Sequence, residues 1–440
     1  MIPVRLREVI AKGVAHPVTF LLAINIASAA LGTAQLAVTL AVLKPTDFAV
    51  IGVLAAIGSV MTGLLDVKLG DLTTRLLYAV PKGEAGRRGA LLATSLWLHL
   101  LAGGITCVLV LAASLLLAPG FLQTTVPDSW WIGVMAARMG AIYPVSALTT
   151  FLRILGAFGV SGWLRLASQA ASTVAMVLAL WVVPSLDGYF LGAASASAIA
   201  LALAALVATK EVHRGLGTRL WQRPEPAALS AFRGAGNFLA GSSLAGIAKL
   251  LSRSCDVLVV AALGNDTLTG LYRVARQGYD TIAGLTDAVH QFYTPTIVDS
   301  ISRQRWGDYR KHRFRLMLIG GMAAGGVIAG SWLVLRPLAT ASYPHYLEAL
   351  PAFEVLGALL VVTLGIHGWL WPTLVASGRM GWFGLFGIAG ALLQLGALAW
   401  LGWSGRLDAT TAALAAWIMA LVSYGPLLLV RWRHRQRTSP

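Results

Sequence analysis

Long apolar stretches alternate with short polar connections along the whole chain. A helix needs about 20 predominantly apolar residues to cross a bilayer. Stretches that reach this length are found at 18–43, 47–67, 91–116, 130–152, 162–184, 188–209, 235–262, 268–293, 314–336, 347–371, 381–403 and 408–430. The pattern predicts an all-α membrane protein with about twelve transmembrane helices.

The composition and the charge distribution support this prediction. Of the 440 residues, 57% are hydrophobic and 12% are charged, whereas about a quarter are charged in a typical soluble domain. The net charge of +16 comes mainly from basic residues in alternate connections, and the other connections hold only Lys44, Arg336 and Arg406. Because basic connections stay on the cytoplasmic side, we expect both termini in the cytoplasm and no nucleic-acid partner.

A weak internal repeat divides the predicted helices into two halves. Gly63–Asp66 matches Gly284–Asp287, and Gly156–Gly159 matches Gly378–Gly381 at nearly the same spacing. The sequence therefore predicts two pseudo-symmetric six-helix lobes around a central cavity, at 1–212 and 234–440, with a cytoplasmic linker at 213–233. In transporters built from such repeats, the substrate binds between the two halves.

Two neighbouring apolar stretches carry charged residues at helical spacing, on either side of the turn at 264–266. The charged residues are Lys249, Arg253 and Asp256 in the first stretch, and Arg273, Arg276, Asp280 and Asp287 in the second. A charge at the centre of a membrane helix costs about 2.5–3.5 kcal/mol, so these side chains face protein or water rather than lipid. Arg138 lies at a similar depth, roughly 12 Å inward from the interfacial pair Trp130 and Trp131.

Motifs for enzymatic chemistry are missing from the sequence. There is no P-loop, no metal-spaced His/Cys cluster and no Ser/His/Asp set that the topology brings together. Cys107 and Cys255 both fall within predicted spans, where they are expected to pack as small residues. We expect a transporter rather than an enzyme, without a cofactor, and driven by an ion gradient, the membrane potential or the gradient of its substrate.

Several short segments resemble one family. They are Asp256–Val260, Leu263-Gly264, Gly270–Ala275, Phe292–Pro295 and Leu374–Arg379. In this layout of twelve spans, they are similar to the polysaccharide (O-antigen or exopolysaccharide, Wzx-like) flippases of the MATE-related MOP flippase superfamily. The segment Asp66–Gly70 departs from the family's Asp-x-Gly-Leu element by an inserted lysine.

The resemblance implies a flippase that moves a polyprenyl-diphosphate-linked oligosaccharide across the bacterial inner membrane by alternating access. Its partners would be this lipid-linked glycan, the membrane lipids and glycan polymerase or assembly proteins. From their depth and helical face, we expect five residues to bind the diphosphate: Arg138, Lys249, Arg253, Arg273 and Arg276. The acidic residues expected to balance these charges, or to couple transport to protons or sodium, are Asp66, Asp256, Asp280 and Asp287.

Alternatives to this function and to these roles remain open. A multidrug cation antiporter of the same superfamily would favour an acidic lumen, whereas the spans hold slightly more basic than acidic residues. A glycan polymerase or ligase would need a large outer loop, and a non-transporting scaffold in glycan assembly would not need intramembrane charges. The pairs Arg253 with Asp256 and Arg276 with Asp280 also fit a purely structural role in helix packing.

Overall fold

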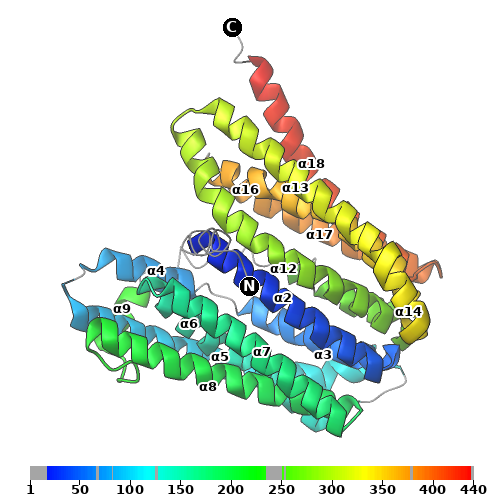
Figure 1. The fold of residues 1–440 in the computed structure, drawn as a ribbon, viewed down its shortest axis with the longest axis horizontal. Helices are drawn as coiled ribbons and strands as arrows, with labels where there is room; N and C mark the ends of the chain where they lie inside the picture. The colour runs from blue at the N-terminus through cyan, green and yellow to red at the C-terminus, as the bar shows by residue number, and fades with distance from the viewer. Residues whose placement is uncertain are drawn as a thin grey trace, which may run out of the picture. The chain divides into compact units, whose positions relative to one another are not determined.

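The computed structural model describes residues 17–65, 69–81, 83–123, 127–233, 250–251, 254–376 and 380–437. These residues form helices and turns, without a strand in any of these ranges (Figure 1). The helices of the first half are α2 (Pro17–Val42), α3 (Pro45–Leu64), α4 (Leu69–Ala79), α5 (Ala85–Phe121), α6 (Ser129–Ile154), α7 (Phe158–Val182), α8 (Leu186–Leu216) and α9 (Pro226–Arg233).

The second half contains α-helices interrupted by short π-helical and 3₁₀ segments. Its elements are α11 (Cys255–Leu263), α12 (Asp266–Ser302), α13 (Trp306–Gly330), the π-helix η1 (Ser331–Leu335), α14 (Arg336–Ser342), the 3₁₀ turn η2 (Pro344–Tyr346), α15 (Ala349–Ala358), the π-helix η3 (Val361–Ile366), α16 (His367–Ala376), α17 (Met380–Trp403) and α18 (Ala409–Arg437). The all-α prediction is confirmed.

Ten helical segments within the described ranges are long and apolar enough to cross a membrane. The other two predicted spans are 235–262 and 268–293. Most of the first lies outside the described residues, and α11 forms its final part. The second lies within α12, which has 37 residues but carries the charged stripe. The chain is a multi-pass membrane protein.

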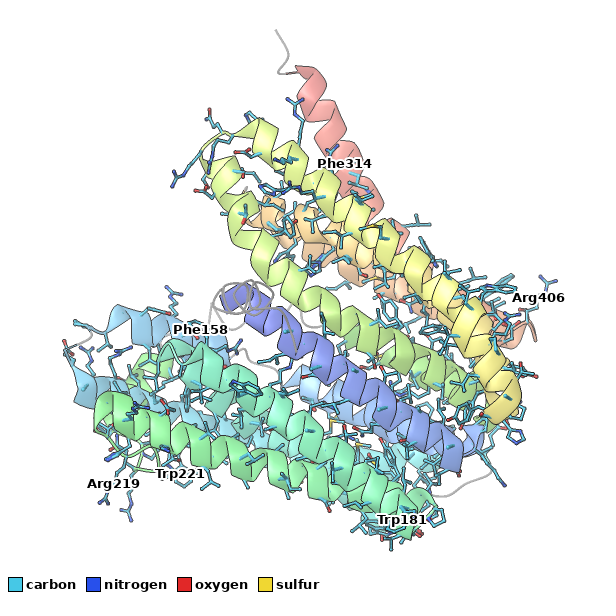
Figure 2. The ribbon with its side chains drawn as sticks, in the orientation of Figure 1. Phe158, Trp181, Arg219, Trp221, Phe314 and Arg406 are labelled. Carbon is cyan, nitrogen blue, oxygen red and sulfur yellow. The ribbon has the colours of Figure 1, made fainter. Side chains whose placement is uncertain are left out.

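Many large apolar side chains project outward from the helices. Trp181 is 81% exposed and Phe314 is 70% exposed, and Figure 2 shows both pointing away from the ribbon. Water would disfavour so much exposed apolar surface, whereas the hydrocarbon core of a bilayer accommodates it. The arrangement is that of helices surrounded by lipid.

Packing divides the chain into two compact units. The N-terminal unit comprises Met1–Val42, Ile57–Leu117 and Pro127–Gly246, and the C-terminal unit comprises Leu43–Ala56, Ala118–Val126 and Ile247–Pro440. The predicted pseudo-symmetry of two six-helix lobes, with a linker at 213–233, stays a prediction.

The N-terminal unit is held together by close contacts between its helices. Helix α7 packs on α2 and α8, and α6 packs on α8 (Figure 1). Gly103 of α5 and Gly140 of α6 bring two backbones together, since a Cβ at Gly103 would lie 2.5 Å from the carbonyl oxygen of Gly140. Small residues allow such close packing within a bilayer.

The C-terminal unit is built around α12, which contacts α11, α13, α15, α16 and α18. The turn that precedes α12 is the one expected from the sequence, because the Asn265 side chain accepts a hydrogen bond of 2.8 Å from the Leu268 amide and caps the helix. Gly270 then brings α12 against the start of α3, where any Cβ would clash with the Pro45 carbonyl. These contacts fix where the charged face of α12 lies.

Candidate functional site

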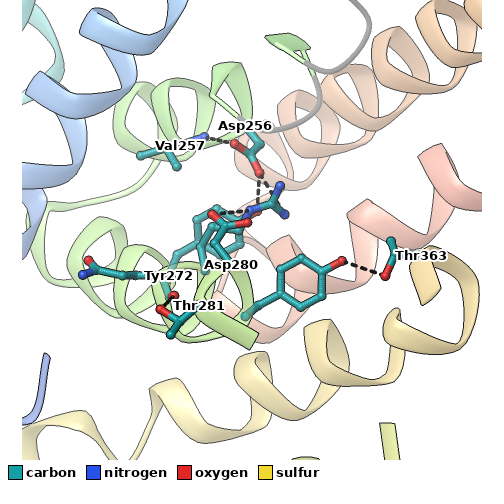
Figure 3. A network of polar contacts seen from close by, with 9 residues as sticks. Asp256, Val257, Tyr272, Asp280, Thr281 and Thr363 are labelled. Carbon is teal, nitrogen blue, oxygen red and sulfur yellow. Dashed lines mark hydrogen bonds and ion pairs between the residues drawn. The ribbon is translucent and has the colours of Figure 1, made fainter. Parts of the chain in front are cut away.

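A buried ionic network joins α11 to α12 within the C-terminal unit (Figure 3). Asp256 is fully buried and Arg276 is 4% exposed, and the Arg276 Nη1 lies 3.6 Å from Asp256 Oδ2. The Tyr272 hydroxyl donates a hydrogen bond of 2.7 Å to the same oxygen, while the Val257 amide donates to Oδ1 at 2.8 Å. The carboxylate of Asp256 is therefore compensated on both oxygens.

The network extends from Arg276 to Asp280, one turn further along α12. The Arg276 Nε lies 3.8 Å from Asp280 Oδ2, at the spacing expected for a helical pair. Asp280 is the more accessible member, with 37% of its side chain exposed. The Arg276 guanidinium also lies 5.6 Å from the ring centre of Tyr279, whose hydroxyl donates a 3.4 Å hydrogen bond to Thr363 in η3. Arg276 thus links α11, α12 and, through Tyr279, η3.

Arg273 lies one turn before Arg276 and is surrounded differently. It is half-buried, and its side-chain carbons pack against Gly52 of α3, where a Cβ would lie 2.9 Å from the Arg273 Cγ. Its Nε is buried and makes no hydrogen bond, and Arg273 has no ion-pair partner in the described part of the chain. Glycine at position 52 therefore makes room for a charged side chain that is not neutralised by the described residues.

Arg138 is exposed on α6 of the N-terminal unit, also without an ion pair among the described residues. Lys249, Arg253 and Asp66 lie outside the described residues, and so does the side chain of Asp287. The structure thus gives the surroundings of Arg138, Arg273, Arg276, Asp256 and Asp280, and it brings the last three together. Their roles in binding or coupling stay predictions.

A second charged cluster, which the sequence analysis did not single out, surrounds Glu354 of α15. The Ser331 hydroxyl donates a hydrogen bond of 2.8 Å to the Glu354 carboxylate, and the Arg336 Nη2 lies 3.6 Å from it. The Arg336 guanidinium also stacks 4.0 Å from the Trp332 ring centre. The π-helical segment η1 carries Ser331 and Trp332, and π-helical segments are frequent at functional positions.

Tyr272 is the main site residue missed from the sequence. It lies four residues before Arg276, so it shares that face of α12, and this spacing was the signal that could have found it. Metal coordination has no support among the described residues, since no group of three or more His, Cys, Asp or Glu side chains converges there.

Comparison with known proteins gives no match to a family model or to a curated protein sequence. Solved structures do match. An inward-facing multidrug resistance MATE family transporter of the MOP superfamily has a TM-score of 0.70 at 16% identity, over 94% of this chain and 96% of the other. The lipid II flippase MurJ, in an inward closed conformation, has a TM-score of 0.69 at 12% identity, over 92% and 87%.

The chain has the fold of the MOP-superfamily transporters. A further match from Pyrococcus furiosus is described as a MOP superfamily transporter whose binding pocket has reversed polarity, which suggests a different function. Its TM-score is 0.59 at 16% identity, over 96% of this chain and 97% of the other. Proteins of this fold therefore include transporters whose binding pockets differ in polarity, so the substrate has to be argued from this chain's own residues.

Proposed function

We propose that the protein is a flippase that moves a polyprenyl-diphosphate-linked oligosaccharide from the inner to the outer leaflet of a bacterial inner membrane. One observation carries the proposal. Each described intramembrane carboxylate, namely Asp256, Asp280 and Glu354, lies within 4.0 Å of an arginine. Arg138 and Arg273, by contrast, have no acidic partner in the described ranges, so the uncompensated intramembrane charge among the described residues is positive.

This charge pattern suits a diphosphate better than a cationic drug. A diphosphate brings about two negative charges into a region of low dielectric constant, where arginine offers strong, charge-assisted hydrogen bonds. A cationic substrate would instead require acidic side chains that are not already paired. The prenyl chain of the substrate remains in lipid, where its apolar surface costs nothing.

Transport follows from the alternating access that this fold is expected to support, with the cytoplasmic termini that the basic connections predict. The membrane lipids and the lipid-linked glycan are the partners in this scheme, and glycan polymerase or assembly proteins would act on the exported product. The MurJ match supports the proposal because that protein is described as a lipid II flippase.

The test is depletion of the protein from its host, followed by measurement of lipid-linked glycan on the cytoplasmic leaflet. Depletion should cause lipid-linked glycan to accumulate there, and re-expression of the wild-type protein should reverse this. The variants Arg273→Gln and Arg138→Gln should each lower the rate of export about tenfold or more. Losing one charge-assisted hydrogen bond costs about 1.5–3 kcal/mol, and each 1.4 kcal/mol corresponds to a factor of 10. Arg406→Gln is the matched control, because Arg406 is exposed at a turn between α17 and α18 (Figure 2).

The outcomes separate the alternatives. Unchanged lipid-linked glycan together with new sensitivity to cationic drugs would replace the flippase by a multidrug antiporter. No change in lipid-linked glycan or in drug sensitivity would favour the alternative of a non-transporting scaffold in glycan assembly. Full rescue by Arg273→Gln and by Arg138→Gln would refute the proposed diphosphate site, even if the protein is a flippase.

A further inference from the structure

A second group of titratable side chains lies in the C-terminal unit, on three different helices. The rings of His290 in α12 and His367 in α16 have centroids 5.4 Å apart. The Nδ1 of His367 lies 3.2 Å from the hydroxyl oxygen of Tyr424 in α18. Both imidazoles are half-buried, and the ionic network around Arg276 does not include them.

Gly368 makes this approach possible. A Cβ at position 368 would lie 3.2 Å from both Cδ2 and Nε2 of His290, so the imidazole rests closely against the backbone of α16. Any change in the charge or hydration of His290 therefore acts directly on the contact between α12 and α16. Any other residue type at this position would require the His290 ring to shift by a few tenths of an ångström.

We propose that His290 and His367 form one proton-binding site, and that its occupancy couples the proposed transport to the proton gradient. The inference rests on the proposed transport function. Histidine is the side chain whose ordinary pKa, about 6.5, lies within the physiological range. Two imidazoles at 5.4 Å interact strongly in a low-dielectric interior, so binding of a first proton to one ring opposes binding of a second. The pair takes up a single proton first.

The ring of Trp371 favours that single charge. The His367 ring lies 5.6 Å from the ring centre of Trp371, whereas Tyr424 meets it edge-on through its hydroxyl. The faces of such rings attract cations, with a contribution of about 0.5–2 kcal/mol that grows as water is excluded. These contacts favour a protonated imidazole at His367.

Among the described side chains, the charge on a neighbouring helix opposes binding of a second proton. On α13, Arg313 lies 5.4 Å from the ring centre of Trp369, and His312 packs on Tyr293 of α12 at 5.8 Å. Among the described side chains, helix α18 contributes Tyr424, while η3 and α17 contain no titratable residue. The positive charge of Arg313 opposes the second proton further.

The position of the pair explains how a proton would affect transport. His290 lies on the same continuous helix as Arg273, Arg276 and Asp280. A change in the contact between α12 and α16 therefore acts on the helix that carries the proposed diphosphate site. By linkage, a substrate that favours one arrangement of α12 changes proton affinity by the same factor as protons change substrate affinity.

The experiment is a pH titration of ¹⁵N-histidine-labelled protein in lipid nanodiscs, followed by NMR between pH 5 and 8. His290→Gln and His367→Gln assign two of the eight histidine signals. We expect each replacement to shift the titration midpoint of the remaining ring by about 1 pH unit or more. His99→Gln is the matched control, because His99 is buried in the N-terminal unit and its Nδ1 contacts the carbonyl of Ser95 in its own helix.

Tyr424→Phe keeps the ring and removes only the hydroxyl, so it tests the site if either histidine variant fails to fold. It should shift the midpoint of His367 and leave that of His99 unchanged. Titration of the two rings without mutual influence, or neutrality of both throughout the pH range, would overturn the proposal. Because the titration needs no substrate, a failed glycan export assay would refute the proposed function and leave the proton site standing.

Proton coupling itself is tested on the initial rate of lipid-linked glycan export in proteoliposomes at pH 6 and pH 8. The wild-type rate should change severalfold between the two conditions, whereas His367→Gln should remove most of this dependence. An unchanged pH profile in His367→Gln, with export intact, would show that the pair binds a proton without coupling it to transport.

Discussion

The interiors of the two units bury their polar side chains in different ways. In the N-terminal unit, Thr73 and Ser95 are fully buried, and their hydroxyl oxygens lie 2.6 Å apart. Both residues are neutral, and Thr73 also donates to the Leu69 carbonyl of its own helix at 2.7 Å. In the C-terminal unit, the buried polar groups include the ions Asp256 and Arg276, which belong to different helices.

The difference lies in where each group finds its partner. A hydroxyl that bonds to its own helix stays satisfied when the neighbouring helix changes, as in Ser and Thr of many membrane helices. A buried carboxylate depends on charged and polar side chains of another helix, and leaving it unpaired is expensive. The N-terminal unit should therefore tolerate loss of a polar partner, whereas the C-terminal unit should not.

Arg276→Ala should have the largest effect. It leaves Asp256 buried without its cation, so we expect the protein to lose about 3–5 kcal/mol of stability. Thermal unfolding in detergent, measured by tryptophan fluorescence, gives the shift in Tm. Arg273→Ala is the control on the same helix, since Arg273 has no ion pair in the described part of the chain.

A double variant separates loss of the ion pair from loss of packing. Asp256→Asn together with Arg276→Gln removes both charges and keeps a polar side chain at each position, so it should be more stable than Arg276→Ala alone. Equal stability of Arg276→Ala and wild type would show that the pair contributes nothing to the C-terminal unit.

The sequence predicts the spans and the charged face but not the contacts between helices. Lipid requires long apolar helices, and the cap at Asn265 has a local signature, so both are readable from the chain. The sequence also places Arg276 and Asp280 one turn apart. The pairing of Asp256 with Arg276 depends instead on how closely α12 approaches its neighbours, which Gly52 and Gly270 permit. Local spacing carries no information about partners on another helix.

Tyr272→Phe should lower the stability less than Arg276→Ala does. The phenol donates one hydrogen bond of 2.7 Å to the ionised Asp256, while Arg276 and the Val257 amide remain in place. Hydrogen bonds to charged groups contribute about 1.5–3 kcal/mol, so the loss in stability should fall below that of Arg276→Ala. The same Tm measurement ranks the two variants. A larger effect of Tyr272→Phe would assign the main compensation of Asp256 to the phenol rather than to the guanidinium.

The smallest effect is expected for Ser95→Ala, the counterpart of Tyr272→Phe in the N-terminal unit. Each substitution removes one hydroxyl from a fully buried side chain. Thr73 keeps its bond to the Leu69 carbonyl after Ser95 is replaced, so no donor is left unsatisfied, and the cost should be about 1 kcal/mol or less. Equal losses of Tm in the two variants would show that the charge on Asp256 is not what separates the two interiors. A clear excess for Tyr272→Phe would show that it is.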